Sequence, residues 1–170
     1  MDSALDEEVY LAYGKAAWLR NDFAEAEARF ADAAAVLRRQ GEAASSLLAA
    51  CLIDLGDSAS RLARHEAAQQ AFAEALGIQR KTLPASDPSL IRTLYGLGWA
   101  RRGLGDLPEA IACFKVALHV QLATGDPGHK VLALIHAALG SAHMAAGDFI
   151  LAEADFVSCM RAERSYATGG

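Results

Sequence analysis

The sequence predicts an all-α fold in which four antiparallel helix-turn-helix repeats stack into an α-solenoid. The main observation is a set of residues that recur every 42 positions along the 170-residue chain. Hydrophobic residues make up 53% of the chain, and much of this is alanine, which favours helix and lets helices pack closely. Such arrays expose long binding surfaces, so the pattern favours a binding function. The recurring positions hold phenylalanine (Phe30, Phe72, Phe114 and Phe156), glycine (Gly14, Gly56, Gly98 and Gly140), alanine (Ala26, Ala68, Ala110 and Ala152) and a further small residue (Ala33, Ala75, Ala117 and Cys159).

Each repeat is expected to contain two amphipathic helices joined by a tight turn. The four repeats span about residues 7–40, 49–82, 91–124 and 133–164, within a single domain of residues 1–170. Asn21 and Asp22 mark the turn of the first repeat. The second repeat has Ala63 and Arg64 at the same place and carries the weakest turn signal.

The third and fourth repeats carry clearer helix boundaries. Asp87 and Pro88 predict an N-cap followed by proline in the first turn, where its missing N–H has no cost. Gly105 breaks this helix, and Asp106 is expected to cap the next one. The corresponding residues of the fourth repeat are Asp126 and Pro127 before the first helix and Gly147 and Asp148 in the turn.

The recurring positions indicate how each hairpin packs. The glycine and first alanine columns are expected to lie on facing sides of the turn, where small side chains let the two backbones approach. The phenylalanines are expected to fill the larger gap in each repeat and to reach the following helix. The residues expected to pack beside them are Tyr13, Leu55, Leu97 and Leu139.

Composition and charge exclude several classes of function. A formal net charge of −5 and a pI near 5.5 argue against a general nucleic-acid or anionic-membrane surface. The sequence shows no export signal and no apolar run long enough to span a bilayer. Its three widely spaced cysteines, Cys51, Cys113 and Cys159, suit neither a disulfide framework nor a zinc site, so a cytoplasmic location is expected.

No sequence motif for catalysis or for a cofactor is present. The chain has no HExxH motif, no glycine-rich phosphate loop and no recognisable nucleophile triad. His129, His136 and His143 share one helix face, but residues seven apart lie about 10 Å apart along the axis, too far to hold one metal. His136 and His143 are expected to pack within the hairpin. We therefore expect no enzyme, no metal and no cofactor.

The repeat pattern resembles the tetratricopeptide repeat family over about residues 6–164. The matching residues are Leu97-Gly98, Gly105-Asp106-Leu107, Ala110, Phe114 and Ala117, and again Leu139-Gly140, Gly147-Asp148-Phe149, Ala152, Phe156 and Cys159. The family unit has ~34 residues, and the longer unit here is similar to the kinesin light chain subtype. The resemblance implies a right-handed α-solenoid whose first helices line a concave groove that binds a partner peptide or helix.

Carried over by repeat position, the resemblance implies a partner-binding surface on the first helices. Its residues are Lys15 and Trp18 in repeat one, Asp54, Asp57 and Arg61 in repeat two, and Arg92, Tyr95, Trp99 and Arg102 in repeat three. The last four lie along one helical stripe, and aromatic residues with arginine are typical of binding hot spots. Alternatively, Tyr95 and Trp99 pack between repeats and the arginines form a solvated face.

Three functions remain open at this point. A protein-interaction module is favoured, with an amphipathic helix as the ligand, because the paired asparagines of peptide-binding relatives are absent here. A regulatory domain that senses a small peptide or metabolite is the first alternative. The second is self-assembly, because Ile150 and Leu151 of the last repeat hold positions that are polar or small in the first two repeats. Either the chain is a fragment of a longer protein or this end is covered by a copy of itself or another partner, and association is favoured.

Overall fold

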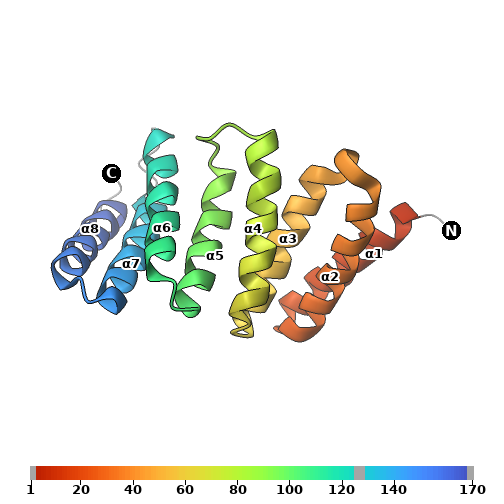
Figure 1. The fold of residues 1–170 in the computed structure, drawn as a ribbon, viewed down its shortest axis with the longest axis horizontal. Helices are drawn as coiled ribbons and strands as arrows, with labels where there is room; N and C mark the ends of the chain where they lie inside the picture. Colours follow the sequence, from red (N-terminus) through yellow and green to blue (C-terminus); the bar gives the residue numbers. More distant parts are fainter. Residues whose placement is uncertain (1–2, 125–128, 168–170) are drawn as a thin grey trace. The chain divides into compact units, whose positions relative to one another are not determined.

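The computed structural model describes residues 3–124 and 129–167, and nearly all of them are helical (Figure 1). No strand occurs in these two segments. The long helices are α1 (Ser3–Leu19), α2 (Phe23–Gln40), α3 (Ser45–Arg61), α4 (His65–Thr82), α5 (Ser89–Gly103), α6 (Leu107–Ala123), α7 (His129–Ala146) and α8 (Phe149–Ala167), with a short 3₁₀ helix at Gly41–Ala44. The predicted all-α class is confirmed.

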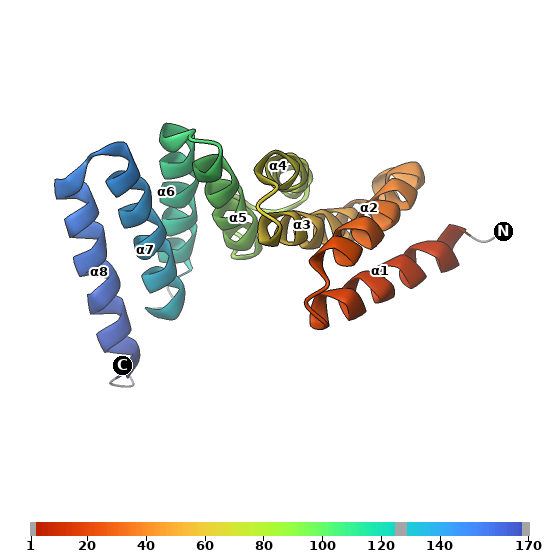
Figure 2. The same cartoon turned by 90° about the horizontal axis from the view of Figure 1, so that it is seen from below.

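The helices pair in chain order as α1 with α2, α3 with α4, α5 with α6 and α7 with α8. The chain divides into two compact units, Met1–Leu83 and Pro84–Gly170, each built from two of these hairpins. Within the first unit α3 also packs on α2, and within the second α7 packs on α6 and touches α5 (Figure 2). The first helices begin two to four residues before the predicted repeat starts, for example at Ser45 rather than residue 49. Asp126 and Pro127, predicted to start α7, lie outside the described residues.

All four hairpin turns are built in the same way. One residue adopts a left-handed conformation, and its N–H and that of the next residue bond back to carbonyls of the preceding helix, as in a Schellman motif. In the first turn, Asn21 N–H bonds to Trp18 O at 2.9 Å and Asp22 N–H to Ala17 O at 2.9 Å. The four left-handed residues, again 42 apart, are Asn21 (φ 61°), Ala63 (φ 56°), Gly105 (φ 82°) and Gly147 (φ 83°).

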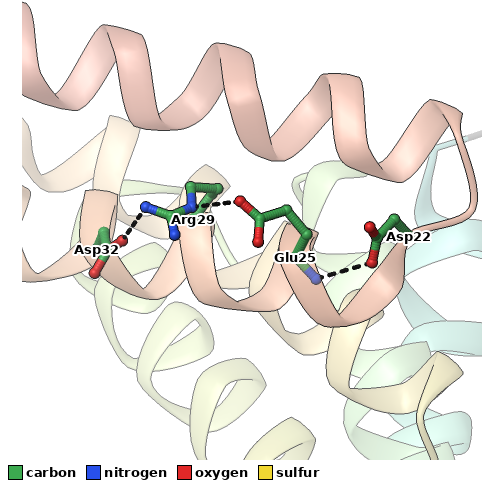
Figure 3. Close-up of polar contacts among 4 residues, drawn as sticks. All are labelled: Asp22, Glu25, Arg29 and Asp32. Atoms are coloured by element: carbon green, nitrogen blue, oxygen red, sulfur yellow. Dashed lines mark hydrogen bonds and ion pairs between the residues drawn. The ribbon is translucent and has the colours of Figure 1, made fainter.

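The residue after each left-handed residue is the N-cap of the next helix. The Asp22 carboxylate accepts the N–H of Glu25 at 3.2 Å, and Arg29 then bonds Glu25 at 2.8 Å and Asp32 at 2.9 Å, which ties the exposed face of α2 together (Figure 3). The expected cap at Asp106 is only partly formed, because this residue holds the N-cap position but its carboxylate makes no capping bond.

Each glycine of the recurring column leaves space for the phenylalanine ring of the same hairpin. A Cβ on Gly14 would lie 2.7 Å from the Phe30 ring, and one on Gly98 would lie 2.5 Å from the Phe114 ring. The pairs Gly56 with Phe72 and Gly140 with Phe156 repeat this contact. The phenylalanines therefore pack against the preceding helix of their own hairpin. The expected contact of the rings with the following helix stays a prediction.

Burial confirms most of the predicted core. Phe30, Phe72 and Phe114 are fully buried, as are the alanine columns of the first three repeats. Leu97 and Leu139 pack in the core as expected. Tyr13 does not, since 62% of it is exposed on α1, and its expected role beside Phe30 is wrong.

Candidate functional site

The four residues predicted for α5 lie together on one side of that helix. The Tyr95 and Trp99 ring centroids are 6.1 Å apart, and the Arg102 guanidinium carbon lies 5.2 Å from the centre of the Trp99 ring. Arg92 is exposed and lies one turn before Tyr95. Arginine held over a tryptophan face is attracted by the negative face of the ring. The predicted stripe is thus a continuous row of cations and aromatic rings.

The same aromatic rings also contribute to the core of the hairpin. The Phe114 centroid is 5.9 Å from Tyr95 and 5.8 Å from Trp99, so both rings pack on the buried phenylalanine, Trp99 edgewise and Tyr95 at a tilt. Tyr95 and Trp99 are accordingly half-buried. The two rings thus pack within their own hairpin, on Phe114 of α6, and not between repeats as the alternative interpretation expected. Their role in partner binding stays a prediction.

A pocket of about 360 Å³ opens beside this row, between α5 and α7. Its walls are mostly apolar and include Tyr95 and Arg92 from the predicted stripe. The other lining residues are Pro88, Ile91, Gln121, Val131, Leu134 and Ile135. Sequence analysis missed the contribution of α7, although Val131, Leu134 and Ile135 show the three- and four-residue spacing of one helix face.

Two predicted residues of the first unit, Trp18 and Arg61, form a second cluster around the Phe23 ring. The Arg61 guanidinium carbon lies 4.7 Å from the centre of the Phe23 ring, and this ring meets Trp18 edgewise at 5.0 Å. Lys15 is exposed on α1. Phe23 was missed by the sequence analysis, and its position at the start of a second helix was the available signal.

Asp54 and Asp57 complete the predicted set and are half-buried on α3. Burial raises the pKa of the Cys51 thiol to about 12, and the nearby Asp54 carboxylate contributes to this rise. Cys51 is thus a protonated core residue whose Sγ contacts the Phe30 carbonyl oxygen at 3.2 Å. This fits the structural role that buried cysteines usually have.

His136 and His143 pack within the last hairpin, as predicted. Asp155 of α8 accepts from both, with 3.2 Å to His136 Nδ1 and 2.8 Å to His143 Nδ1. Among the residues that the structure describes, no group of three or more histidine, cysteine or acidic side chains is placed to hold a metal ion. A membrane-spanning helix is likewise absent from that part of the chain.

The helical hairpins repeat every 42 residues, share one turn geometry and carry the same contact between glycine and phenylalanine. These features define a helical-repeat protein of the α-solenoid class. The Tetratricopeptide repeat family matches residues 48–89, one full period that runs through α3 and α4. This match supports the family resemblance for the second repeat, and the structural likenesses below show the same fold over almost the whole chain. No significant match was found among curated proteins.

Solved structures share this fold over almost the whole chain. BtubC (BKLC) from P. vanneervenii is 19% identical, with a TM-score of 0.85, over 98% of this chain and 66% of BtubC. Aspartyl phosphate phosphatase F from Bacillus subtilis is 19% identical, with a TM-score of 0.76, over 99% of this chain and 42% of the phosphatase. The TPR-like repeats of a Podosopora anserina kinesin light chain are 13% identical, with a TM-score of 0.58, over 96% and 95%. This chain thus spans just under two thirds of BtubC and less than half of the phosphatase.

Proposed function

We propose that the chain is a non-catalytic protein-interaction module that binds a helix or peptide of a partner protein on the first helices of its repeats. The pocket between α5 and α7 carries this proposal, because it places an apolar cavity beside the row formed by Arg92, Tyr95, Trp99 and Arg102. Cavities of this size suit one or two large apolar side chains.

The surroundings of the pocket favour a partner with acidic residues next to its apolar anchor. Arg92 lies in the pocket wall, and Arg102 lies almost three turns further along α5. Arg102 is half-buried and its Nε is enclosed, so a ligand carboxylate would meet the guanidinium at atoms other than Nε. We therefore expect an amphipathic segment with a large apolar side chain flanked by aspartate or glutamate.

The cluster in the first unit would provide further contacts. Lys15, Trp18 and Arg61 combine cationic and aromatic character there, and Asp54 and Asp57 add acidic character on α3. We propose that this cluster also contacts the partner. The proposed compartment is the cytoplasm, which is supported by three cysteines that remain unpaired.

Selection from a phage-displayed library of random 16-residue peptides, each long enough for about four helical turns, tests the proposal directly. The wild-type chain should enrich sequences that combine an apolar anchor with acidic neighbours. The variant Leu134→Arg, which fills the pocket with a charge, should not retain them. Because Leu134 is 49% exposed, this variant should fold normally.

The matched control is Leu122→Arg, an equally simple change at a position that is 62% exposed on α6 and does not line the pocket. Selected peptides should bind this control as they bind the wild type. The double variant Trp99→Ala with Arg102→Ala should lower the affinity for these peptides roughly 10-fold or more, as measured by titration calorimetry. Enrichment that survives Leu134→Arg would refute the pocket as the binding site. If no peptide is enriched and a small metabolite raises the thermal stability of the chain, a sensor role would be favoured instead.

A further inference from the structure

The outer side of α6 is apolar, which distinguishes this helix from the second helices of the other three hairpins. The buried residues of α6 lie on its opposite side, and the helix packs on α5 and α7. On the outer side, Leu122 is 62% exposed and Val116 is 44% exposed. We call this side the α6 outer face, and its residues, at the spacing of one helix face, are Ile111, Ala112, Lys115, Val116, His119, Leu122 and Ala123.

The period provides an internal comparison, because α2, α4 and α8 carry the same repeat positions. Four positions of the α6 outer face are apolar in α6 and polar in all three other helices. The counterparts of Ile111 are Glu27, Gln69 and Glu153, those of Val116 are Asp32, Glu74 and Ser158, those of Leu122 are Arg38, Arg80 and Arg164, and those of Ala123 are Arg39, Lys81 and Ser165. The apolar outer side is therefore a property of the third repeat and not of the repeat in general.

These positions face solvent because of their place in the hairpin, and not because the chain ends nearby. Arg38 is exposed although a following helix, α3, packs on α2. Leu122 is exposed in the same way although α7 packs on α6. A following repeat thus leaves this side of the helix uncovered, so the stacking of repeats does not explain why it is apolar in α6.

The composition of α6 has a cost in the isolated chain. Each of the other second helices carries at least one basic residue in its last turn, where a cation interacts favourably with the carboxyl end of the helix dipole, whereas α6 carries none. Its exposed apolar side chains also remain in contact with water. A local departure of this kind, without a gain inside the fold, is typical of a surface that another molecule covers.

One charged residue defines the chemistry of that molecule. Lys115 is exposed and is the only formally charged residue of the α6 outer face, and its counterparts are the apolar residues Ala31, Ala73 and Val157. A partner that covers the face would remove the Lys115 ammonium group from water, which is costly unless a carboxylate pairs with it. The partner therefore needs an acidic group opposite Lys115 and apolar groups around it.

A second copy of the chain does not meet this requirement through the same face. A two-fold interface joins identical surfaces, and the α6 outer face contains no aspartate or glutamate. Two such faces would bring Lys115 residues together without an acidic partner. The face also consists of one helix and is therefore convex, so the complementary surface is a groove.

We propose that the α6 outer face is a second protein-interaction surface, separate from the α5–α7 pocket. Its partner is a folded protein that presents an apolar groove, such as the groove between two packed helices, with an aspartate or glutamate opposite Lys115. None of the residues of this face lines the α5–α7 pocket. A short peptide cannot enclose a convex helix, so the peptide selection described above reports on the pocket alone.

Ile150 and Leu151, on which the sequence analysis based self-association, lie outside this face on α8. They are 84% and 50% exposed. Their part in self-association stays a prediction, and a second copy of the chain is an outcome that the experiment below detects.

Selection from a displayed library of three-helix bundles, randomised along the groove between two of their helices, tests the proposal. The wild-type chain should enrich bundles whose apolar groove includes an aspartate or glutamate. The double variant Val116→Asp with Leu122→Arg gives α6 the residues that α2 carries at these positions, so it should fold normally, which thermal unfolding checks. This variant should bind most of the selected bundles at least roughly 10-fold more weakly.

Two control variants and one charge exchange sharpen the test. Asp32→Asn with Arg38→Gln changes the same two positions in α2, and Leu134→Arg changes the α5–α7 pocket, so the bundles should bind both as they bind the wild type. Lys115→Glu should abolish binding of a selected bundle. A change of the acidic residue of that bundle to lysine should restore its binding to Lys115→Glu, because the charges are then exchanged.

Enrichment of no bundle would overturn the proposal, as would binding that the double variant on α6 leaves unchanged. Selected bundles that lack an acidic residue and tolerate Lys115→Glu would overturn the predicted chemistry of the partner. Sedimentation velocity in which the wild type associates with itself and the double variant does not would show that a second copy covers the face instead. Loss of peptides in Leu134→Arg concerns only the pocket, so the two proposals can fail separately.

Discussion

Ala63 holds a backbone conformation that alanine rarely adopts. Its φ is 56°, in the left-handed region, whereas Gly105 and Gly147 fill the same place in the third and fourth turns. A Cβ raises the energy of this conformation by roughly 1 to 2 kcal/mol. The second hairpin therefore contains local strain that two of the other turns avoid.

We expect Ala63→Gly to raise the free energy of unfolding by about 1 kcal/mol, since glycine removes the strain but makes the unfolded chain more flexible. Thermal and urea unfolding measure this change. Gly105→Ala is the reciprocal variant and should lower stability by a similar amount, because an added Cβ there meets no atom within 4 Å and only the backbone strain would change. A loss of stability in Ala63→Gly would contradict this account.

At the residue scale, sequence reasoning found the recurring positions but not all of their partners. The period alone identified the glycine and phenylalanine columns and the turn residues. It could not show that Gly98 makes room for the Phe114 ring, because a contact between residues 16 apart depends on how two helices cross. Tyr13 was misplaced for a related reason, since its leucine counterparts suggested a core position that α1 leaves exposed.

The second helices of the first two hairpins are joined by a paired arginine and carboxylate. Arg38 of α2 donates Nε to one oxygen of Glu74 at 2.8 Å and a terminal nitrogen to the other at 2.7 Å. This hydrogen bonding from Arg38 lowers the pKa of Glu74. Because the pKa of Glu74 is lower in the folded than in the unfolded chain, the stabilisation is complete above the unfolded value near 4.5 and is lost as the pH falls through the folded value.

Glu74→Gln should therefore destabilise the chain at pH 7 and have little effect at acid pH. The expected difference at pH 7 is about 0.5 to 1 kcal/mol, since both side chains are more than a third exposed and solvent screens the pair. Urea unfolding at pH 7 and at pH 3 measures it, with Glu153→Gln on α8 as a control that should show no such pH dependence. An equal loss of stability at both pH values would indicate that Glu74 acts through packing instead.

Helix boundaries were predicted well where the turn residues gave a strong sequence signal. The hairpin turns fall at the predicted positions, and even the weak signal at Ala63 and Arg64 marked a real turn. The starts of the first helices were predicted less well, because the linkers before them carry no period and α3 follows a 3₁₀ helix that propensity alone did not reveal. Asp106 shows a further limit, since the sequence places a cap but not the rotamer that would complete it.

Two buried thiols report on the stability of the two compact units. Cys51 lies in the first unit and Cys113 in the second, and both are buried. In repeat arrays, stability is set by each repeat and its neighbours, so a local defect acts mainly on its surroundings. The expected single domain over residues 1–170 remains a prediction that these thiols can test.

We expect Phe30→Leu to speed maleimide labelling of Cys51 more than that of Cys113, and Phe114→Leu to do the reverse. The cost of each change should be below the ~3 to 5 kcal/mol of truncation to alanine. Mass spectrometry of pulse-labelled protein measures both sites, and half-buried Cys159 should label quickly in every variant. Equal acceleration of Cys51 and Cys113 in both variants would show that the chain unfolds as one cooperative domain.

The candidate site could be predicted only to the level of a helix face. The stripe on α5 was predicted from the spacing of its residues. The pocket beside it also depends on the position of α7, which no sequence pattern within α5 predicts. The same holds for Phe23, which belongs to the first-unit cluster because α3 crosses α2 at Arg61. Contacts between repeats depend on the stacking of helices, which the period implies but does not describe.

The shared turn residue limits where the length of this chain can change. Asp22 ends the Schellman motif of one helix and caps the next, so no residue can be inserted there without breaking one of the two. The segments between hairpins have no such double role, and they already differ, as the 3₁₀ helix at Gly41–Ala44 and the extended Leu83 show. Insertions and deletions among homologous chains should therefore accumulate between hairpins, and a fusion tag or loop graft would be tolerated there sooner than inside a hairpin.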